Sequence, residues 1–148
     1  MKKLIIMFFR HGNTAEDCQL SPKGKERAEE FSSRLAKFDV VFSANNGRSV
    51  ETAMILGKTT EKYVIADKVF DDLSEADKII VRLAEIISFV ITNTVTFAGA
   101  ENVTALVVSS SNLVSAAKHF SEGKFPNSLE RLDVIDHLGS FPITISFG

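Results

Sequence analysis

Short apolar runs alternate with segments of helical periodicity along most of this chain, and this alternation constrains the fold more than any other feature. The runs are rich in Val, Ile and Phe, which favour buried strands, and they cover residues 4–9, 39–43, 63–67, 103–110 and 143–147. Segments with helical spacing or helix-start signals separate them, at residues 21–38, 44–58, 74–91 and 112–120. This order predicts an α/β fold, a three-layer α/β/α sandwich with a mostly parallel sheet. The tail from Gly123 is expected to be hairpin-like.

The segment 21–38 carries the clearest helix signal. Ser21 can cap the helix and Pro22 suits its first turn. Gly24 in the same turn lowers helix stability, so we expect it to mark close packing. The apolar face is then formed by Ala28, Phe31, Leu35 and Phe38.

Length and charge narrow the class of protein. A chain of 148 residues fits a single domain, residues 1–148, with a buried core. Its net charge of −2 gives no general attraction to nucleic acid or to an anionic membrane, so a phosphate ligand would need a local cluster of cations. Cys18 is the only cysteine, which excludes an internal disulfide. Without a long apolar segment or a recognisable leader, the expected location is cytoplasmic.

Polar residues follow three of the predicted strands. They are Arg10-His11 after the first, residues 43–48 after the second and residues 109–112 after the fourth. Open α/β sheets bind ligands beyond the carboxyl ends of their strands, so these groups are expected to converge. Two arginines beside a histidine suit a phosphate, because guanidinium groups match its oxygens. A neutral imidazole can attack phosphorus, and water can then release the phosphohistidine.

Four segments resemble the histidine phosphatase (phosphoglycerate mutase-like) superfamily, and they occur in the family's order. They are "FFRHGNT" at 8–14, "LSPKGKERAEEF" at 20–31, "VVFSANNGRSVETAMIL" at 40–56 and "ALVVSSSNLVSAA" at 105–117. The resemblance covers most of residues 4–117 and implies the phosphoglycerate mutase-like fold. In size, the chain is most similar to the small phosphohistidine phosphatases of this superfamily.

The resemblance also implies roles for single residues. His11 matches the histidine that accepts the phosphoryl group, and Arg10 and Arg48 match the arginines that clamp its oxygens. Asn13 matches a polar residue that assists them. We expect Ser43 and Thr52 to support the loop and the helix rather than to touch substrate.

The general acid is placed by position alone. The family commonly keeps a carboxylate after the third strand to protonate the leaving group, and Glu75 is our choice here. The alternatives are Asp71, Asp72 and Asp77. In the competing interpretation these carboxylates are a solvated helix start, with Ser74 as the cap.

The chain departs from the family at its second catalytic histidine, which is replaced by Ser110. A serine hydroxyl cannot replace a charge-assisted donor, and loss of one such donor typically lowers a rate about 10²–10³-fold. Ser110 and Ser111 open a helix, where backbone N–H groups can bind phosphate; plain helix capping is the alternative. Two other histidines remain: we expect His119 to be a surface or core residue, and His137 is a candidate replacement.

Two functions of different class follow. The first is a phosphatase that hydrolyses a phosphomonoester or phosphohistidine through phospho-His11, with reduced activity because of Ser110. The alternative is an inactive phosphatase-fold protein that binds a phosphorylated ligand or a protein partner. The expected partner is a phosphorylated small molecule or a phosphoprotein, without nucleic acid, membrane, cofactor or metal. The sequence leaves the oligomeric state open.

Overall fold

A computed structural model describes residues 2–58, 60, 62–66, 79–97, 99–123 and 134–147. The described elements are β1 (Lys3–Arg10), α1 (Pro22–Ser32), β2 (Val40–Ala44), α2 (Gly47–Leu56), β3 (Tyr63–Ala66), α3 (Ile79–Asn93), a short 3-10 helix η2 (Val95–Phe97), β4 (Asn102–Ser109), α4 (Ser111–Ser121) and β5 (Ser140–Ser146). The five strands form one sheet in the order β3-β2-β4-β1-β5. Each pair is parallel except β1–β5, which is antiparallel. The predicted, mostly parallel α/β sheet is confirmed.

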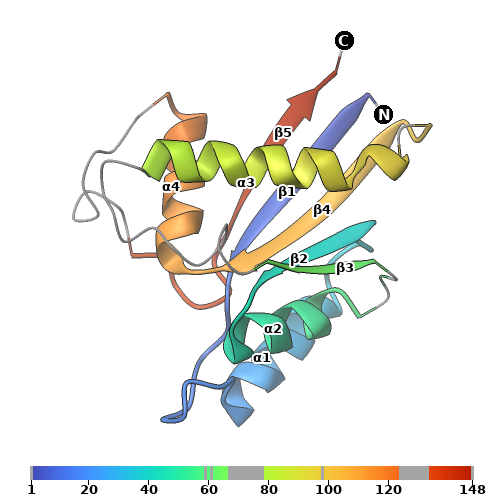
Figure 1. Ribbon diagram of the computed structural model, residues 1–148. Helices are drawn as coiled ribbons and strands as arrows, with labels where there is room; N and C mark the ends of the chain where they lie inside the picture. Colours follow the sequence, from blue (N-terminus) through green and yellow to red (C-terminus); the bar gives the residue numbers. More distant parts are fainter. Residues whose placement is uncertain are drawn as a thin grey trace.

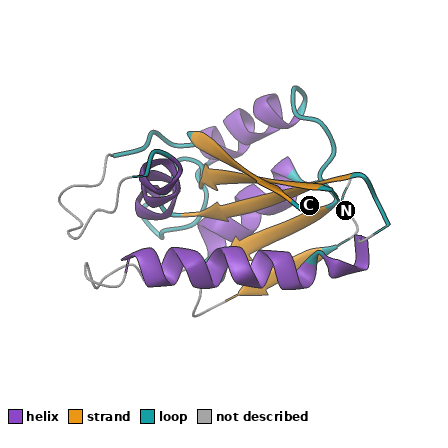
Figure 2. Ribbon diagram, turned by 90° about the horizontal axis from the view of Figure 1, so that it is seen from above, coloured by secondary structure: helices purple, strands orange, loops and turns teal. Residues whose placement is uncertain are grey.

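Helices cover both faces of this sheet. Figure 1 shows α1 and α2 on one face and α3 and α4 on the other, and Figure 2 shows the strands from a second direction with helices around them. Alternate residues of β1 point to opposite faces: Phe8 packs into the core under α3 and α4, and Phe9 into the core under α1 and α2. The three predicted layers therefore enclose two apolar cores.

Helix α1 ends earlier than its apolar spacing predicted. The helix stops at Ser32, so Leu35 and Phe38 lie beyond it, although Phe38 is still buried in the core. The Ser33 hydroxyl donates to the Glu30 carbonyl at 2.7 Å, and turn hydrogen bonds follow. Serine that bonds to nearby backbone offers the chain an alternative to further helix.

The tail was expected to be hairpin-like, and its described residues show a different pairing. Strand β5 lies antiparallel to β1 at the edge of the sheet, with Pro142 opposite Met7. Proline is tolerated there because an edge strand need not donate on its outer side. This return places the segment before β5 beside the carboxyl end of β1.

The predicted helix 74–91 is described from Ile79 and continues to Asn93; residues 74–78 lie outside the described residues. Leu83, Ile86 and Val90 bury its inner face against the sheet. Among the helices described, none has the length and apolar character needed to cross a membrane.

Candidate active site

The sheet register brings the three predicted strand ends together. Arg10 at the end of β1 pairs with Ser109 at the end of β4, and Ser43 in β2 pairs with Val108. Directly after β1, the backbone N–H of His11 donates to the Ser109 carbonyl at 3.0 Å. His11 therefore lies at the carboxyl edge of the three central strands.

The hydrogen bonds of His11 define its tautomer. Its Nδ1 lies 2.9 Å from the Gly12 carbonyl oxygen, which can only accept, so Nδ1 carries the hydrogen. Its Nε2 then carries a lone pair, which accepts a hydrogen bond from Arg48 Nε at 3.1 Å. Burial lowers the pKa of His11 to about 4; the charges of Arg48 and Arg10 act in the same direction, while the Gly12 bond opposes them. His11 is thus neutral at pH 7, and its Nε2 lone pair is engaged by Arg48 rather than by a proton.

This pKa shift predicts a pH-dependent stability. The unfolded chain protonates His11 near pH 6.5, whereas the native imidazole protonates only near pH 4. Between these values the unfolded state holds more protons, so the free energy of unfolding falls as the pH is lowered through this window. The full shift corresponds to roughly 3 kcal/mol. When the free energy of unfolding in urea is measured from pH 7 down to pH 4, it should fall less steeply for His11→Gln than for the wild type. Equal slopes of free energy against pH would contradict the lowered pKa of His11.

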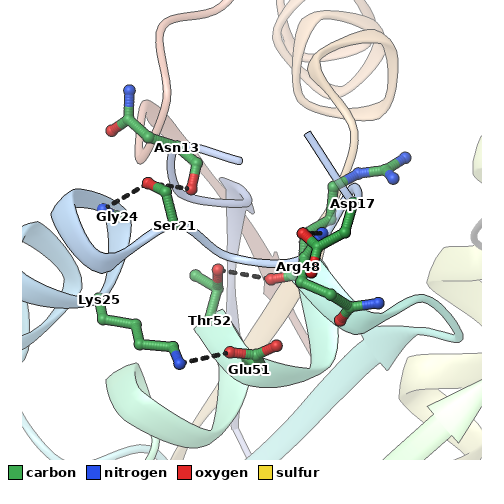
Figure 3. Close-up of polar contacts among 9 residues, drawn as sticks. Asn13, Asp17, Ser21, Gly24, Lys25, Arg48, Glu51 and Thr52 are labelled. Atoms are coloured by element: carbon green, nitrogen blue, oxygen red, sulfur yellow. Dashed lines mark hydrogen bonds and ion pairs between the residues drawn. The ribbon is translucent and has the colours of Figure 1, made fainter. Parts of the chain in front are cut away.

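Arg48 reaches His11 from the start of α2. Asn46 caps this helix by accepting from the Ser49 N–H at 2.9 Å, which places Arg48 in the first turn. A cation there is opposed by the helix dipole, so a local function is a better explanation than helix stability. In Figure 3 the Arg48 guanidinium extends away from the helix and away from Thr52.

Thr52 connects α2 to the loop that carries His11. Its buried hydroxyl accepts from the Gly12 N–H at 3.0 Å and donates to the Arg48 carbonyl at 2.7 Å, the latter drawn in Figure 3. The prediction that Thr52 supports the loop and the helix is confirmed. Ser43 likewise bonds to backbone, donating to the Ala44 carbonyl at 2.8 Å.

Replacing Thr52 should therefore destabilise the protein. Thr52→Val keeps the shape of the side chain but leaves the buried Gly12 N–H without an acceptor, which costs about 1–3 kcal/mol. Thr52→Ser keeps the hydroxyl and is the matched control. The free energy of unfolding, measured by chemical denaturation, should be well below that of Thr52→Ser in the Thr52→Val variant. Equal free energies of unfolding for the two variants would show that the hydroxyl contributes nothing.

Backbone holds one end of the Arg10 guanidinium, and another of its donors is buried without a partner among the residues described. One terminal nitrogen donates to the Ile135 carbonyl at 2.6 Å. Its Nε is buried and has no hydrogen-bond partner among the residues described. Burial lowers the pKa of Arg10, as does Arg48, while Asp136 opposes them; an arginine nonetheless stays cationic. A buried cationic donor of this kind favours an anion as its partner.

The loop after β1 packs directly on the start of α1. The Ser21 hydroxyl accepts from Gly24 N–H and donates to the Asn13 carbonyl, both at 3.0 Å (Figure 3). A Cβ on Gly24 would lie 2.3 Å from the Asn13 oxygen, so only glycine fits. The close packing predicted at Gly24 is confirmed, and it fixes the backbone of Asn13.

The Asn13 side chain points away from this cap (Figure 3) and contacts Arg27, which the sequence did not mark, and His137, the candidate replacement for the second histidine. Its Oδ1 accepts from Arg27 at 2.7 Å, and its Nδ2 lies 3.3 Å from His137 Nδ1. The ring centroids of His137 and His11 are 5.8 Å apart. Arg27 and His137 are therefore additional residues of the site.

Both predicted serines use their hydroxyls as acceptors for backbone N–H groups. Ser110 caps α4 by accepting from Leu113 at 3.4 Å, and Ser111 accepts from Ile135 at 2.7 Å. Direct contact of these serines or of Asn13 with phosphate stays a prediction.

The proposed acid Glu75, with Asp71, Asp72 and Asp77, lies outside the described residues. In the described part of the chain no group of three or more His, Cys, Asp or Glu side chains could hold a metal ion.

The comparisons with known proteins give a family match and a shared fold. A family model described as the histidine phosphatase superfamily (branch 1) matches residues 6–77, which include His11 and Arg48. The resemblance to the histidine phosphatase superfamily is confirmed. No curated protein matches the sequence.

Solved structures of phosphatases and of phosphoglycerate mutases share the fold. A phosphoserine phosphatase mutant from Entamoeba histolytica has 13% identity and a TM-score of 0.69, over 94% of this chain and 89% of that one. A mycobacterial glucosyl-3-phosphoglycerate phosphatase has 13% identity and a TM-score of 0.74, over 97% and 91%. A phosphoglycerate mutase from Bacillus anthracis has 15% identity and a TM-score of 0.74, over 98% and 89%. At these identities the likeness concerns the fold alone.

Proposed function

We propose that this protein is a phosphatase that transfers a phosphoryl group from a phosphomonoester or a phosphohistidine to His11 and then to water. The observation that carries the proposal is the neutral His11 with its Nε2 lone pair directed at the Arg48 guanidinium. An anion attracted to that guanidinium is brought next to the nucleophile. The family match at residues 6–77 supports the same chemistry.

In the first step, Nε2 of His11 attacks phosphorus and the bond to the leaving group breaks, a P–O bond in a phosphomonoester and a P–N bond in a phosphohistidine. The leaving oxygen or nitrogen takes a proton, for which we propose Glu75 as the donor. In the second step, water attacks the phosphohistidine, and inorganic phosphate and neutral His11 are released. Arg10 and Arg48 stabilise the charge on the phosphoryl oxygens in both steps. Ser110 is neutral and short, so it cannot supply a charge-assisted donor, and we expect a reduced rate.

A second candidate function is binding of a phosphorylated ligand or protein without turnover. Its supporting observation is Ser110, whose hydroxyl is engaged by the backbone of α4. Release of phosphate from p-nitrophenyl phosphate and from a phosphohistidine peptide distinguishes the two functions. We expect release that saturates with substrate and is inhibited by inorganic phosphate. Phosphate binding without release would favour the second function.

A further inference from the structure

Hydrogen bonds around Asn13 determine which nitrogen of His137 carries the hydrogen. The Arg27 guanidinium can only donate, and its Nη1 lies 2.7 Å from Asn13 Oδ1, which fixes the orientation of the amide. The amide nitrogen is therefore the atom 3.3 Å from His137 Nδ1. Since an amide NH₂ can only donate, His137 Nδ1 accepts, and the neutral ring carries its hydrogen on Nε2.

The two histidines of the site thus have opposite tautomers. His11 carries its hydrogen on Nδ1 and offers a lone pair at Nε2, whereas His137 offers an N–H at Nε2, on the ring edge away from Asn13. Their centroids are 5.8 Å apart and their planes are tilted by 49°. A tetrahedral phosphoryl group next to His11 is small enough to contact both rings at this separation. The pair combines a nucleophile with a hydrogen-bond donor.

The segment that carries His137 is fixed on both sides. The Ile135 carbonyl accepts a hydrogen bond from Arg10 at 2.6 Å, and the Ile135 N–H donates to the Ser111 hydroxyl at 2.7 Å. Leu138 is buried and donates to the Arg10 carbonyl at 3.2 Å. Its φ of +63° is uncommon for a bulky residue and persists where the surroundings impose it. His137 is therefore held in place before a substrate arrives.

We propose that His137 is a further catalytic residue, whose Nε2–H donates to a non-bridging oxygen of the phosphoryl group while His11 attacks phosphorus. Asn13 and Arg27 are then positioning residues that set its tautomer. The inference rests on the proposed phosphatase function and deepens it. His137, in the loop before β5, would thus provide the hydrogen-bond donor that Ser110 does not supply.

The charges around His137 specify this role more closely. Burial lowers its pKa, Arg10 and Arg27 lower it further, and Asp136 opposes them. These surroundings therefore favour the neutral form of the ring. A neutral imidazole is a good hydrogen-bond donor and a very weak acid, so it stabilises charge on the phosphoryl group and does not protonate the leaving group.

The kinetic test compares p-nitrophenyl phosphate with phenyl phosphate, which has the poorer leaving group. His137→Leu should lower kcat about 10²–10³-fold on both substrates. His137→Gln keeps an N–H donor and should recover most of the rate, and His119→Leu, on α4, is the matched control. A loss for leucine that grows as the leaving group worsens would overturn the donor role, as would a leucine variant with wild-type activity.

Nitrogen-15 NMR of the wild-type protein provides a second test that needs no variant to fold. His137 should show the Nε2–H tautomer and His11 the Nδ1–H tautomer at pH 7; an Nδ1–H tautomer at His137 would overturn the proposal. Active wild-type protein with an unaffected His137→Leu variant would refute this inference alone. Wild-type protein that hydrolyses neither substrate would refute the phosphatase function as well.

Discussion

Replacing His11 with alanine should lower phosphatase activity by a factor of about 10⁴ or more. The reason is that the substitution removes the atom to which the phosphoryl group is transferred, and the residual rate of such variants comes only from binding and charge stabilisation. Arg10 and Arg48 stay in place, so binding of inorganic phosphate should change much less than kcat. Initial rates and phosphate titration by calorimetry measure the two quantities separately.

His119→Ala is the matched control for this experiment, since it removes an imidazole on α4 that has no part in the proposed chemistry. It should keep wild-type kcat and wild-type phosphate affinity. If His11→Ala retained activity within tenfold of the wild type, another residue or a bound water would have to be the nucleophile. The proposed reaction would then be wrong.

Replacing Arg48 with alanine should have the second-largest effect, a loss of about 10³ in kcat. Arginines that stabilise a transferring phosphoryl group contribute about 10³–10⁵ in comparable reactions, and Arg48 also contacts the attacking nitrogen. The Arg48 charge helps to hold the pKa of His11 down to about 4. The variant should therefore combine a lower kcat with a higher pKa for His11.

The pH–rate profile separates these two effects of Arg48. As the pKa of His11 rises, more of the histidine is protonated at acid pH, so the acid limb of kcat/KM should move to higher pH in Arg48→Ala. Arg48→Lys keeps the charge but loses the fork of donors, and it should leave the limb closer to its wild-type position. An unchanged limb in both variants would show that Arg48 does not control His11.

Local sequence rules predicted the part of the site that follows the parallel strands. His11 and Arg10 come directly after β1, Arg48 starts a helix after β2, and strand ends in an open sheet meet at one edge. The capping alternative for Ser110 was also a local prediction, and the structure shows that bond. Each of these inferences needs only short stretches of sequence and the parallel order of the strands.

The rest of the site depends on long-range pairing that local patterns do not encode. His137 joins His11 because β5 returns antiparallel beside β1, a pairing between segments more than 120 residues apart. Nothing in the local sequence marked Arg27, and it joins the site because Gly24 lets α1 pack against Asn13. The early end of α1 at Ser32 has one local and one long-range contribution, because the Ser33 hydroxyl bonds to the Glu30 carbonyl and the Ser32 hydroxyl to the Ile55 carbonyl.

Rapid-quench trapping of a phosphoenzyme tests the central claim most directly. Wild-type protein would be mixed with phosphorus-32-labelled substrate, quenched in base within milliseconds to seconds, digested and mapped. We expect acid-labile phosphate on Nε2 of His11, formed at least as fast as steady-state turnover and absent from His11→Ala. Turnover without labelled His11, or label on Nδ1, would contradict the account.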